Sequence, residues 1–554
     1  MIENLGFKYA FWIVMGMATI TFIAGINLPI MGIDATQYAS ISMEMAESGN
    51  YLEVMHRGND YLDKPPLLFW LSSLSFNLFG IENWSYRLPS LLFVYLGIFA
   101  TFRLGSLLYS KSAGYIGAII FSTTEAISII SHDVRTDTIL ISSIVFSIWC
   151  IIEFLQREKL KFLVLGFIGI GLAMLCKGPI GLMVPILALS THFIIRKQWK
   201  NFFRWEWLLG IFIVAIIICP MVYGLYTQYD AQPEKFTTLS SGKRVQGISG
   251  IVFYFWEQSF GRLTGASEWK DASFSYHFFI GTFIWSFLPW TILGFLALWN
   301  KMKLAIRTKE IAEFYTVGAI ILPFIALSMS QFKLDHYIYI IYPFIAIISG
   351  NYIAQLAHKN QSSFIAIIQI IIIGIMGVGV ILIGTVTFTN VTIIYGFIIT
   401  ALFLLIIATY LKRKSILAVV LTTAISACFV NVFMKVHFYQ NLAHYDGQYI
   451  AAIITNERNI PTENQHVIDI SPHCYDFYTK SITHYSGTLG ELVKSEIQGH
   501  SFLVKEEVFK KIDLDNLQPE VYPIQHHSTT KLNFDFLKES TRDKSTENLY
   551  LLVF

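Results

Sequence analysis

The sequence predicts an all-α polytopic membrane protein of about 13 transmembrane helices, followed by a small α/β domain. Hydrophobic residues make up 54% of the 554 residues and charged residues only 14%, whereas a soluble globular protein carries about 25% charge. Apolar stretches of nearly the length that a bilayer requires follow one another as far as residue 434. We therefore expect a membrane domain at 1–434 and a soluble domain at 435–554.

Thirteen segments are candidates for the membrane helices, some of them close to the lower limit of length. They are Tyr9–Pro29, Pro89–Tyr109, Ala113–Ile130, Thr138–Leu155, Phe162–Cys176, Ile180–Ile195, Trp207–Tyr226, Tyr276–Leu298, Phe314–Ser330, Tyr337–Leu356, Phe364–Phe388, Thr392–Leu411 and Ile416–Met434. Leu67–Phe79 is apolar but too short to span, which predicts an interfacial or re-entrant helix.

Lysine and arginine concentrate in alternate loops, which indicates the cytoplasmic side. These residues are Lys111, Arg157, Lys159, Lys161, Arg196, Lys197, Lys200, Arg204, Lys301, Lys303, Arg307, Lys309, Lys359, Lys412, Arg413 and Lys414. The first loop (30–88), the long loop 227–275 and the C-terminal domain then share the outer side. The net charge of +2 provides no basic field for nucleic acid, so no nucleic-acid partner is expected.

The C-terminal part changes in character. A helical pattern at Tyr449–Asn456 precedes strand-like runs at Val467–Ile470, Phe502–Lys505 and Leu549–Phe554, which predicts a small α/β domain. The sequence contains no internal repeat, and this disfavours transporters built from paired halves.

The first outer loop gathers chemically useful side chains between Gly32 and Trp70. Asp34 precedes a helical pattern at 35–47 with Gln37 three residues later, so a helix cap and a catalytic base are both open for this carboxylate. Tyr61, Asp63 and Lys64 precede Pro65 and Pro66. These prolines fix the backbone, so we expect the acid and the lysine in a stiff extended segment.

Five cations lie at the expected outer ends of spans, where the positive-inside bias disfavours them. They are Arg87, Arg135, Lys177, Arg262 and Lys333. One such residue would be a snorkelling side chain, but several around one face predict an anion site, because phosphate needs multiple cationic donors. Asp137 starts an apolar run, which favours a helix cap and leaves a site role open. Glu257 and Arg262 are spaced as separate ligands rather than as one ion pair.

With these motifs, the chain resembles the bacterial lipid A aminoarabinose transferase group, which is related to protein O-mannosyltransferases and has the GT-C membrane glycosyltransferase fold. The resemblance covers 32–356 by motif and implies that Asp34 and Asp137 are the catalytic carboxylates. It implies lipid-phosphate and donor contacts for Tyr61, Lys64, Lys177, Arg262 and Tyr337. It also implies a divalent metal, Zn or Mg/Mn, at Asp63 and Glu257. The family's Asp-Glu-x-Arg-Tyr is Asp34-Ala35-Thr36-Gln37-Tyr38 here, a departure that concerns the donor or acceptor head group.

The resemblance implies an inverting glycosyltransferase of the bacterial cytoplasmic membrane, with its active site on the outer, periplasmic side. It would move a sugar from a polyprenyl-phosphate carrier to a lipid A, glycan or protein acceptor. No nucleotide cofactor is expected, because the sequence has no Gly-rich phosphate loop. Two alternatives stay open: a lipid or polysaccharide transporter, and an oligosaccharyl or O-antigen transferring enzyme of the same fold.

Overall fold

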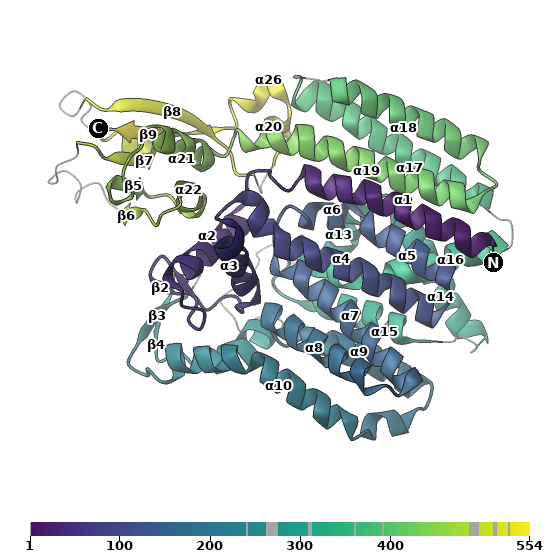
Figure 1. The fold of residues 1–554 in the computed structure, drawn as a ribbon. Coiled ribbons are helices and arrows are strands. Elements are labelled where there is room, and N and C mark those ends of the chain that lie inside the picture. The colour runs from purple at the N-terminus through teal and green to yellow at the C-terminus, as the bar shows by residue number, and fades with distance from the viewer. Residues whose placement is uncertain are drawn as a thin grey trace.

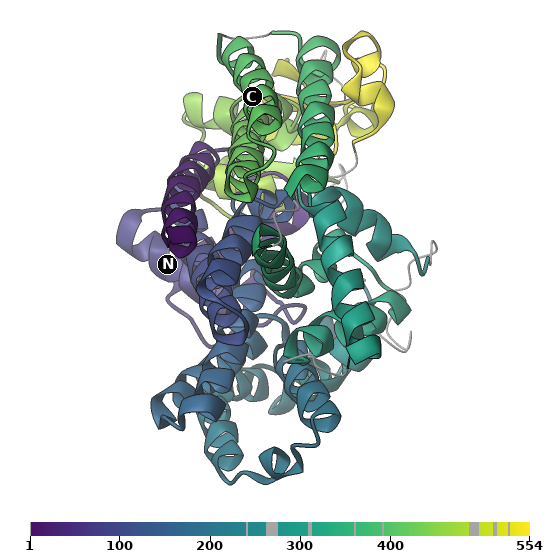
Figure 2. The same cartoon turned by 90° about the vertical axis from the view of Figure 1, so that its right-hand side faces the viewer.

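The computed structural model of this chain describes residues 2–239, 242–261, 275–308, 313–358, 362–390, 393–486, 498–512, 518–529 and 532–554. Its helices lie side by side in one bundle (Figure 1). At the top of the figure lie α17 (Ser362–Leu382), α18 (Ile393–Leu411) and α19 (Ile416–Phe433), and at the bottom α8 (Leu160–Lys177), α9 (Ile180–Ile195) and α10 (Glu206–Leu225). The C-terminal domain and the first loop lie together at one end of the bundle, and the N-terminus lies at the other. Figure 2 views the bundle from that N-terminal end.

Among the described residues, nine helical runs are long and apolar enough to cross a membrane. They are α1 (Ile2–Ala24), α4 (Asn83–Leu108), α7 (Thr136–Arg157), α8 (Leu160–Lys177), α10 (Glu206–Leu225) with η2 (Tyr226–Asp230), η4 (Asp335–Ile341) with α16 (Tyr342–His358), α17 (Ser362–Leu382) with η5 (Ile383–Thr387), α18 (Ile393–Leu411), and α19 (Ile416–Phe433) with η6 (Met434–Phe438) and α20 (Tyr439–Ala443). The chain is thus a multi-span membrane protein.

The other four predicted segments are helical too, but each is short or broken. The first is divided into α5 (Lys111–Ser122) and α6 (Glu125–Ile130). A second consists of α13 (Phe278–Ser286) and α14 (Thr291–Thr308), which meet at a bend of 119°. The remaining two are α9 (Ile180–Ile195) and α15 (Tyr315–Met329), with 16 and 15 residues. All of the predicted segments are therefore helical where they are described, but fewer are long enough to cross a membrane alone.

The first loop folds as two helices joined by a hairpin. Helix α2 (Ile33–Ser48) lies where the sequence predicts a helix, and α3 (Leu67–Phe79) has the bounds predicted for the interfacial segment. Between them, β1 (Met55–His56) pairs antiparallel with β2 (Asn59–Asp60). The two residues of the turn, Arg57 and Gly58, have φ of 55° and 69°, as a type I′ hairpin requires.

Further short elements complete the loops between the helices. They are η1 (Trp199–Phe203), β3 (Phe236–Thr238), β4 (Arg244–Gln246), α11 (Gly250–Val252) and η3 (Phe253–Gly261). Strands β3 and β4 pair antiparallel. The long loop that contains them approaches the first loop: the Asp60 carboxylate accepts hydrogen bonds from Gln228 Nε2 and Lys235 Nζ, each at 2.9 Å.

The C-terminal domain is built on a five-stranded sheet of order β6-β5-β7-β9-β8. Its elements are α21 (Gly447–Glu457), η7 (Thr462–Asn464), β5 (Gln465–Ile468), α22 (His473–Thr479), β6 (His484–Ser486), β7 (Ser501–Lys505), α23 (Glu506–Phe509), β8 (Glu520–His526), α25 (Phe534–Leu537), α26 (Glu539–Arg542) and β9 (Glu547–Val553). Strand β5 runs parallel to β6 and β7, whereas β9 runs antiparallel to β7 and β8. The predicted helix and three strands are present, and β6 and β8 are additional.

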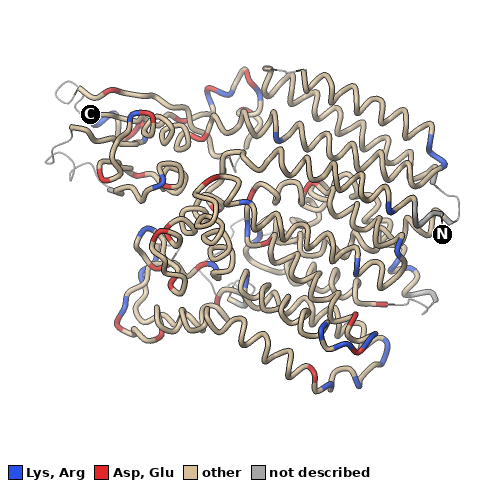
Figure 3. Tube along the Cα trace, in the orientation of Figure 1, with Lys and Arg blue, Asp and Glu red and all other residues tan. Residues whose placement is uncertain are grey.

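Charged residues are unevenly distributed along the bundle. Figure 3 shows Lys and Arg at the loops of the end that carries the N-terminus, and few charges along the helices themselves. Mixed charges cover the opposite end, where the first loop and the C-terminal domain lie. This distribution agrees with the alternation of basic loops in the sequence.

Candidate functional site

A cavity of about 970 Å³, open to solvent, lies between Lys64 of the first loop and the helices of the bundle. Its wall is mostly apolar and is built by side chains of α7, α9, α15 and η4. Its polar members include Lys64, Asp137, Lys177 and Tyr337, all of which are predicted as site residues. A second cavity of about 380 Å³ is lined by Tyr61, Pro65 and Pro66 and shares Lys64 with the first.

Lys177 lies at the centre of the larger cavity's polar group. Its Nζ donates to Asp137 Oδ1 at 2.6 Å and lies 4.0 Å from the centroid of the Tyr337 ring. Asp137 is only 4% exposed, and its other oxygen lies 3.6 Å from His336 Nε2. The last residue of α8, the first turn of α7 and the short helix η4 thus place a cation, an acid and a phenol at one point of an apolar cavity.

Asp34 belongs to a second ion cluster beside the first. Its Oδ2 accepts from Arg135 Nη1 at 2.9 Å, and Arg135 Nε also donates to Asp133 at 2.8 Å. Burial alone would lower the pKa of the Arg135 guanidinium, but the Asp133 and Asp34 carboxylates raise it above its usual value, so Arg135 stays charged. Arg135 lies two residues before Asp137, which lines the larger cavity, so this cluster lies close to the cavity.

The phenol of Tyr38 lies within range of the same carboxylates. Burial raises its pKa well above the usual value, and the neighbouring Tyr61, Asp34 and Asp63 act in the same direction. Tyr38 is therefore neutral at any physiological pH. Its ring packs against Phe69 of α3, as does the ring of Tyr61, with centroids 5.9 and 6.0 Å apart.

Two buried basic side chains, Arg87 and Lys435, hold the turn that carries Asp133 and Arg135. Arg87 is fully buried, and its Nε donates to the His132 carbonyl at 2.7 Å while its Nη1 donates to the Ile26 carbonyl at 3.0 Å. Lys435 Nζ donates to Ser131 Oγ at 2.8 Å. The prediction that Arg87 belongs to an anion site is therefore wrong, because backbone carbonyls already occupy its guanidinium.

Lys64 is held in the stiff segment that the sequence predicts. The prolines that follow it lead directly into α3, whose N-cap is Pro66. Lys64 Nζ lies 2.5 Å from Asp63 Oδ2, and both side chains are 14% exposed. An ammonium group in this position can bind a second anion in either cavity that it lines.

The two helix-cap interpretations are wrong. Gly32 is the N-cap of α2, so Asp34 is already inside the helix, and Arg135 takes its carboxylate. Arg135 is likewise the N-cap of α7, and Asp137 pairs with Lys177 instead. In both cases a cation from a distant segment provides a stronger partner than the helix's own amide groups.

The side chains predicted as metal ligands do not form a metal site as they are placed. Asp63 is paired with Lys64, and Glu257 lies exposed on η3. Within the described ranges, no three His, Cys, Asp or Glu side chains converge closely enough to hold an ion. The metal therefore stays a prediction, and no step below uses it. Arg262, predicted to contact the phosphate, lies outside the described residues.

Two site residues, Asp133 and His336, were not assigned roles from the sequence, and Arg135 was predicted only as one of several cations of an anion site. Asp133 and Arg135 belong to the polar hexapeptide before α7, and His336 belongs to the turn before Tyr337. Their position in polar turns between apolar segments was the sequence feature that could have indicated a functional site. Their partners were not predictable, because Arg135 and Asp34 are 101 residues apart in the chain.

The chain is similar in sequence to a known protein family and to several curated proteins. A family model described as dolichyl-phosphate-mannose-protein mannosyltransferase matches residues 63–223. An undecaprenyl phosphate-alpha-4-amino-4-deoxy-L-arabinose arabinosyl transferase of Edwardsiella ictaluri is 24% identical over 338 residues, which are 59% of this chain and 56% of that protein. The corresponding protein of Wigglesworthia glossinidia brevipalpis is 26% identical over 344 residues, 61% of this chain and 57% of that protein. The chain thus spans little more than half the length of these curated relatives.

Solved structures define the fold over nearly the whole chain. ArnT from Cupriavidus metallidurans in the apo state superposes with a TM-score of 0.73 at 18% identity, covering 98% of this chain and 97% of that one. The same protein bound to undecaprenyl phosphate gives a TM-score of 0.73 at 17% identity with the same coverage. These superpositions show that this chain has the fold of ArnT. The resemblance to the aminoarabinose transferase-like group is confirmed.

Proposed function

We propose that this chain is a glycosyltransferase that takes a sugar from a polyprenyl-phosphate carrier and transfers it, with inversion, to an acceptor at the membrane surface. The observation that carries the proposal is the larger cavity, because an apolar wall ending in Lys64 and Lys177 suits a long prenyl chain with an anionic head. Lipid A is the acceptor that the resemblance to the lipid A aminoarabinose transferase group implies, and a glycan or a protein is the alternative.

The carrier phosphate is the leaving group in this proposal. The acceptor oxygen forms a bond to the anomeric carbon of the sugar as the bond from that carbon to the phosphate oxygen breaks. Negative charge then grows on the phosphate, and Lys64 and Lys177 stabilise it. Tyr337, whose ring faces the Lys177 ammonium, lies where its phenol can orient the same phosphate.

Asp34 is the proposed base for an acceptor hydroxyl. Its carboxylate pairs with Arg135, and its side chain is 42% exposed, so it is accessible to an acceptor. Asp137 is nearly buried and paired with Lys177, which suits it better to holding that lysine than to taking a proton. An acceptor that attacks through its own phosphate would need no base.

The orientation of the protein follows from the same proposal. The basic loops would face the cytoplasm, and the site and the C-terminal domain would face the periplasm. A carrier lipid flipped to the outer leaflet would then reach the cavity from the bilayer. This arrangement favours an enzyme over a transporter, because the ionic groups that line the larger cavity, Lys64, Asp137 and Lys177, lie in the first loop and at the ends of α7 and α8.

Lys64→Ala tests the proposed phosphate contact. We expect transfer to fall by one to two decades, since loss of a charge-assisted hydrogen bond costs about 1.5–3 kcal/mol and 1.4 kcal/mol corresponds to a factor of ten. The measurement is sugar transfer by the purified protein at varied concentrations of the polyprenyl-phosphate sugar.

Lys480→Ala is the matched control, because this lysine also pairs with an acid of the first loop, Glu82, but lines neither cavity. It should keep its dependence on the donor. Unchanged turnover of Lys64→Ala, with wild-type dependence on the donor, would rule out the assigned role.

A further inference from the structure

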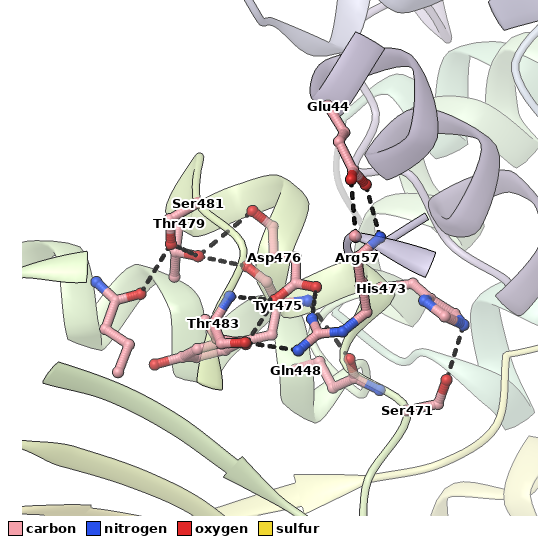
Figure 4. A network of polar contacts seen from close by, with 12 residues as sticks. Glu44, Arg57, Gln448, Ser471, His473, Tyr475, Asp476, Thr479, Ser481 and Thr483 are labelled. Carbon is pink, nitrogen blue, oxygen red and sulfur yellow. Dashed lines mark hydrogen bonds and ion pairs between the residues drawn. The ribbon is translucent and has the colours of Figure 1, made fainter. Parts of the chain in front are cut away.

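The first loop is tied to the C-terminal domain through one buried ion pair (Figure 4). Arg57, at the tip of the β1–β2 hairpin, reaches α22, where its Nη1 pairs with Asp476 Oδ2 and its Nη2 donates to the Thr483 carbonyl at 2.5 Å. Asp476 is completely buried, and its other oxygen accepts from Thr483 N at 3.1 Å and Thr483 Oγ1 at 2.6 Å. The C-terminal domain thus provides a carboxylate and a backbone carbonyl that together bind this guanidinium.

The same hairpin turn is tied to the helix that carries Asp34. Both carboxylate oxygens of Glu44, on α2, accept backbone hydrogen bonds from the turn, from Arg57 N at 2.6 Å and Gly58 N at 2.8 Å. Arg57 has a left-handed φ of 55°, a conformation that disfavours a residue with a Cβ. An arginine in this place is explained by its side-chain contacts with the C-terminal domain.

Uncharged contacts surround the ion pair. The rings of His56 and His473 lie with centroids 4.6 Å apart. Burial lowers the pKa of His56 to about 3 and that of His473 to about 4, and Arg57 acts in the same direction on both. Both rings are therefore neutral near pH 7 and add no positive charge beside Arg57. Phe477 of α22 packs against Phe76, with centroids 6.1 Å apart.

The hairpin leads directly into the proposed site. Strand β2 ends at Asp60, and the chain continues through Tyr61 and Asp63 to Lys64. On its other side the hairpin is held by the hydrogen bonds from Gln228 and Lys235 to Asp60. Two attachments therefore fix the approach to Lys64, and the C-terminal domain provides one of them.

We propose that Arg57 and Asp476 are positioning residues of the transfer reaction, through which the C-terminal domain holds Asp34 and Lys64 in their working geometry. The inference rests on the proposed function. Neither residue lines the two cavities, so both act through α2 and the hairpin. Misplacing a catalytic group by about 1 Å can cost 10²-fold in rate.

Asp476→Asn in the full-length protein tests the proposal, because asparagine keeps the shape but removes the charge that Arg57 requires. We expect kcat to fall about 10- to 100-fold, with KM for the polyprenyl-phosphate sugar changed less than threefold, because the apolar cavity is intact. By hydrogen exchange, the amides of Arg57, Gly58 and Tyr61 should exchange faster, while those of β7 and β9 keep wild-type rates.

Lys480→Gln is the matched control, since it removes an exposed ion pair with Glu82 from the same interface and should change neither readout. Arg57→Gln should reproduce the effect of Asp476→Asn, and the double variant should be no slower than either single one.

A wild-type kcat for Asp476→Asn, or additive losses in the double variant, would overturn the positioning role alone. Absence of polyprenyl-phosphate-dependent transfer by the wild type would overturn the proposed function and the positioning role with it, even if hydrogen exchange still showed the contact.

Discussion

Replacing Asp34 by asparagine is expected to lower sugar transfer about 10²- to 10⁴-fold, the usual contribution of general-base assistance. The amide cannot accept the acceptor's proton and gives up the charge that pairs with Arg135. Folding should be nearly unaffected, because Asp34 is 42% exposed and does not cap α2. Transfer and thermal stability in detergent would be measured on the same preparation.

Asp133→Asn is the control for Asp34→Asn, because Asp133 pairs with the same arginine but has no assigned part in the chemistry. It should lose less than about tenfold, the factor that corresponds to roughly 1.4 kcal/mol. If Asp34→Asn kept most of its activity, Asp34 would not be the base. Asp137 would then be the remaining candidate, to be tested by the same two assays on Asp137→Asn.

Lys177→Met is expected to abolish binding of polyprenyl phosphate and to destabilise the protein. It leaves Asp137, which is 4% exposed, without its ammonium partner. Breaking a buried ion pair by removing one partner costs about 3–5 kcal/mol, or roughly two to three and a half decades in an equilibrium constant. The measurement is the rise in melting temperature on addition of polyprenyl phosphate, which the wild type should show and the variant should not.

The double variant Lys177→Met/Asp137→Asn separates the two effects of this change. It removes both charges, so the melting temperature should recover toward that of the wild type. Binding of polyprenyl phosphate should stay lost, because the cation that holds the phosphate is still missing. A double variant that regains binding would show that Lys177 acts only by neutralising Asp137.

Local patterns in the sequence predicted the elements well. Helix α3 has the bounds expected for Leu67–Phe79 because Pro66 and Gly80 delimit it. Two breaks were not predicted: the interruption between α5 and α6, and the 119° bend between α13 and α14. A continuous run of apolar residues does not show where a helix breaks. The membrane class and the α/β domain depend on composition and periodicity, which the sequence contains directly.

The site depends on partners that lie far apart in the chain, and there the sequence was less informative. Lys64, Lys177 and Tyr337 line one cavity, and the family resemblance had implied a lipid-phosphate role for all three. The cap interpretations of Asp34 and Asp137 failed because a local pattern cannot show Arg135 or Lys177 arriving from another helix. The pair of Arg57 and Asp476, 419 residues apart, could not be foreseen for the same reason.

The central claim is that this protein consumes a polyprenyl-phosphate-linked sugar. Mass spectrometry of lipids extracted from a deletion strain, complemented with either the wild type or Asp34→Asn, tests it most directly. The account predicts that the deletion and the Asp34→Asn strains accumulate the polyprenyl-phosphate-linked sugar and lose one sugar increment from an envelope acceptor, and that the wild type restores both. Lipid profiles that are the same in all strains, with no accumulated carrier-linked sugar, would contradict it.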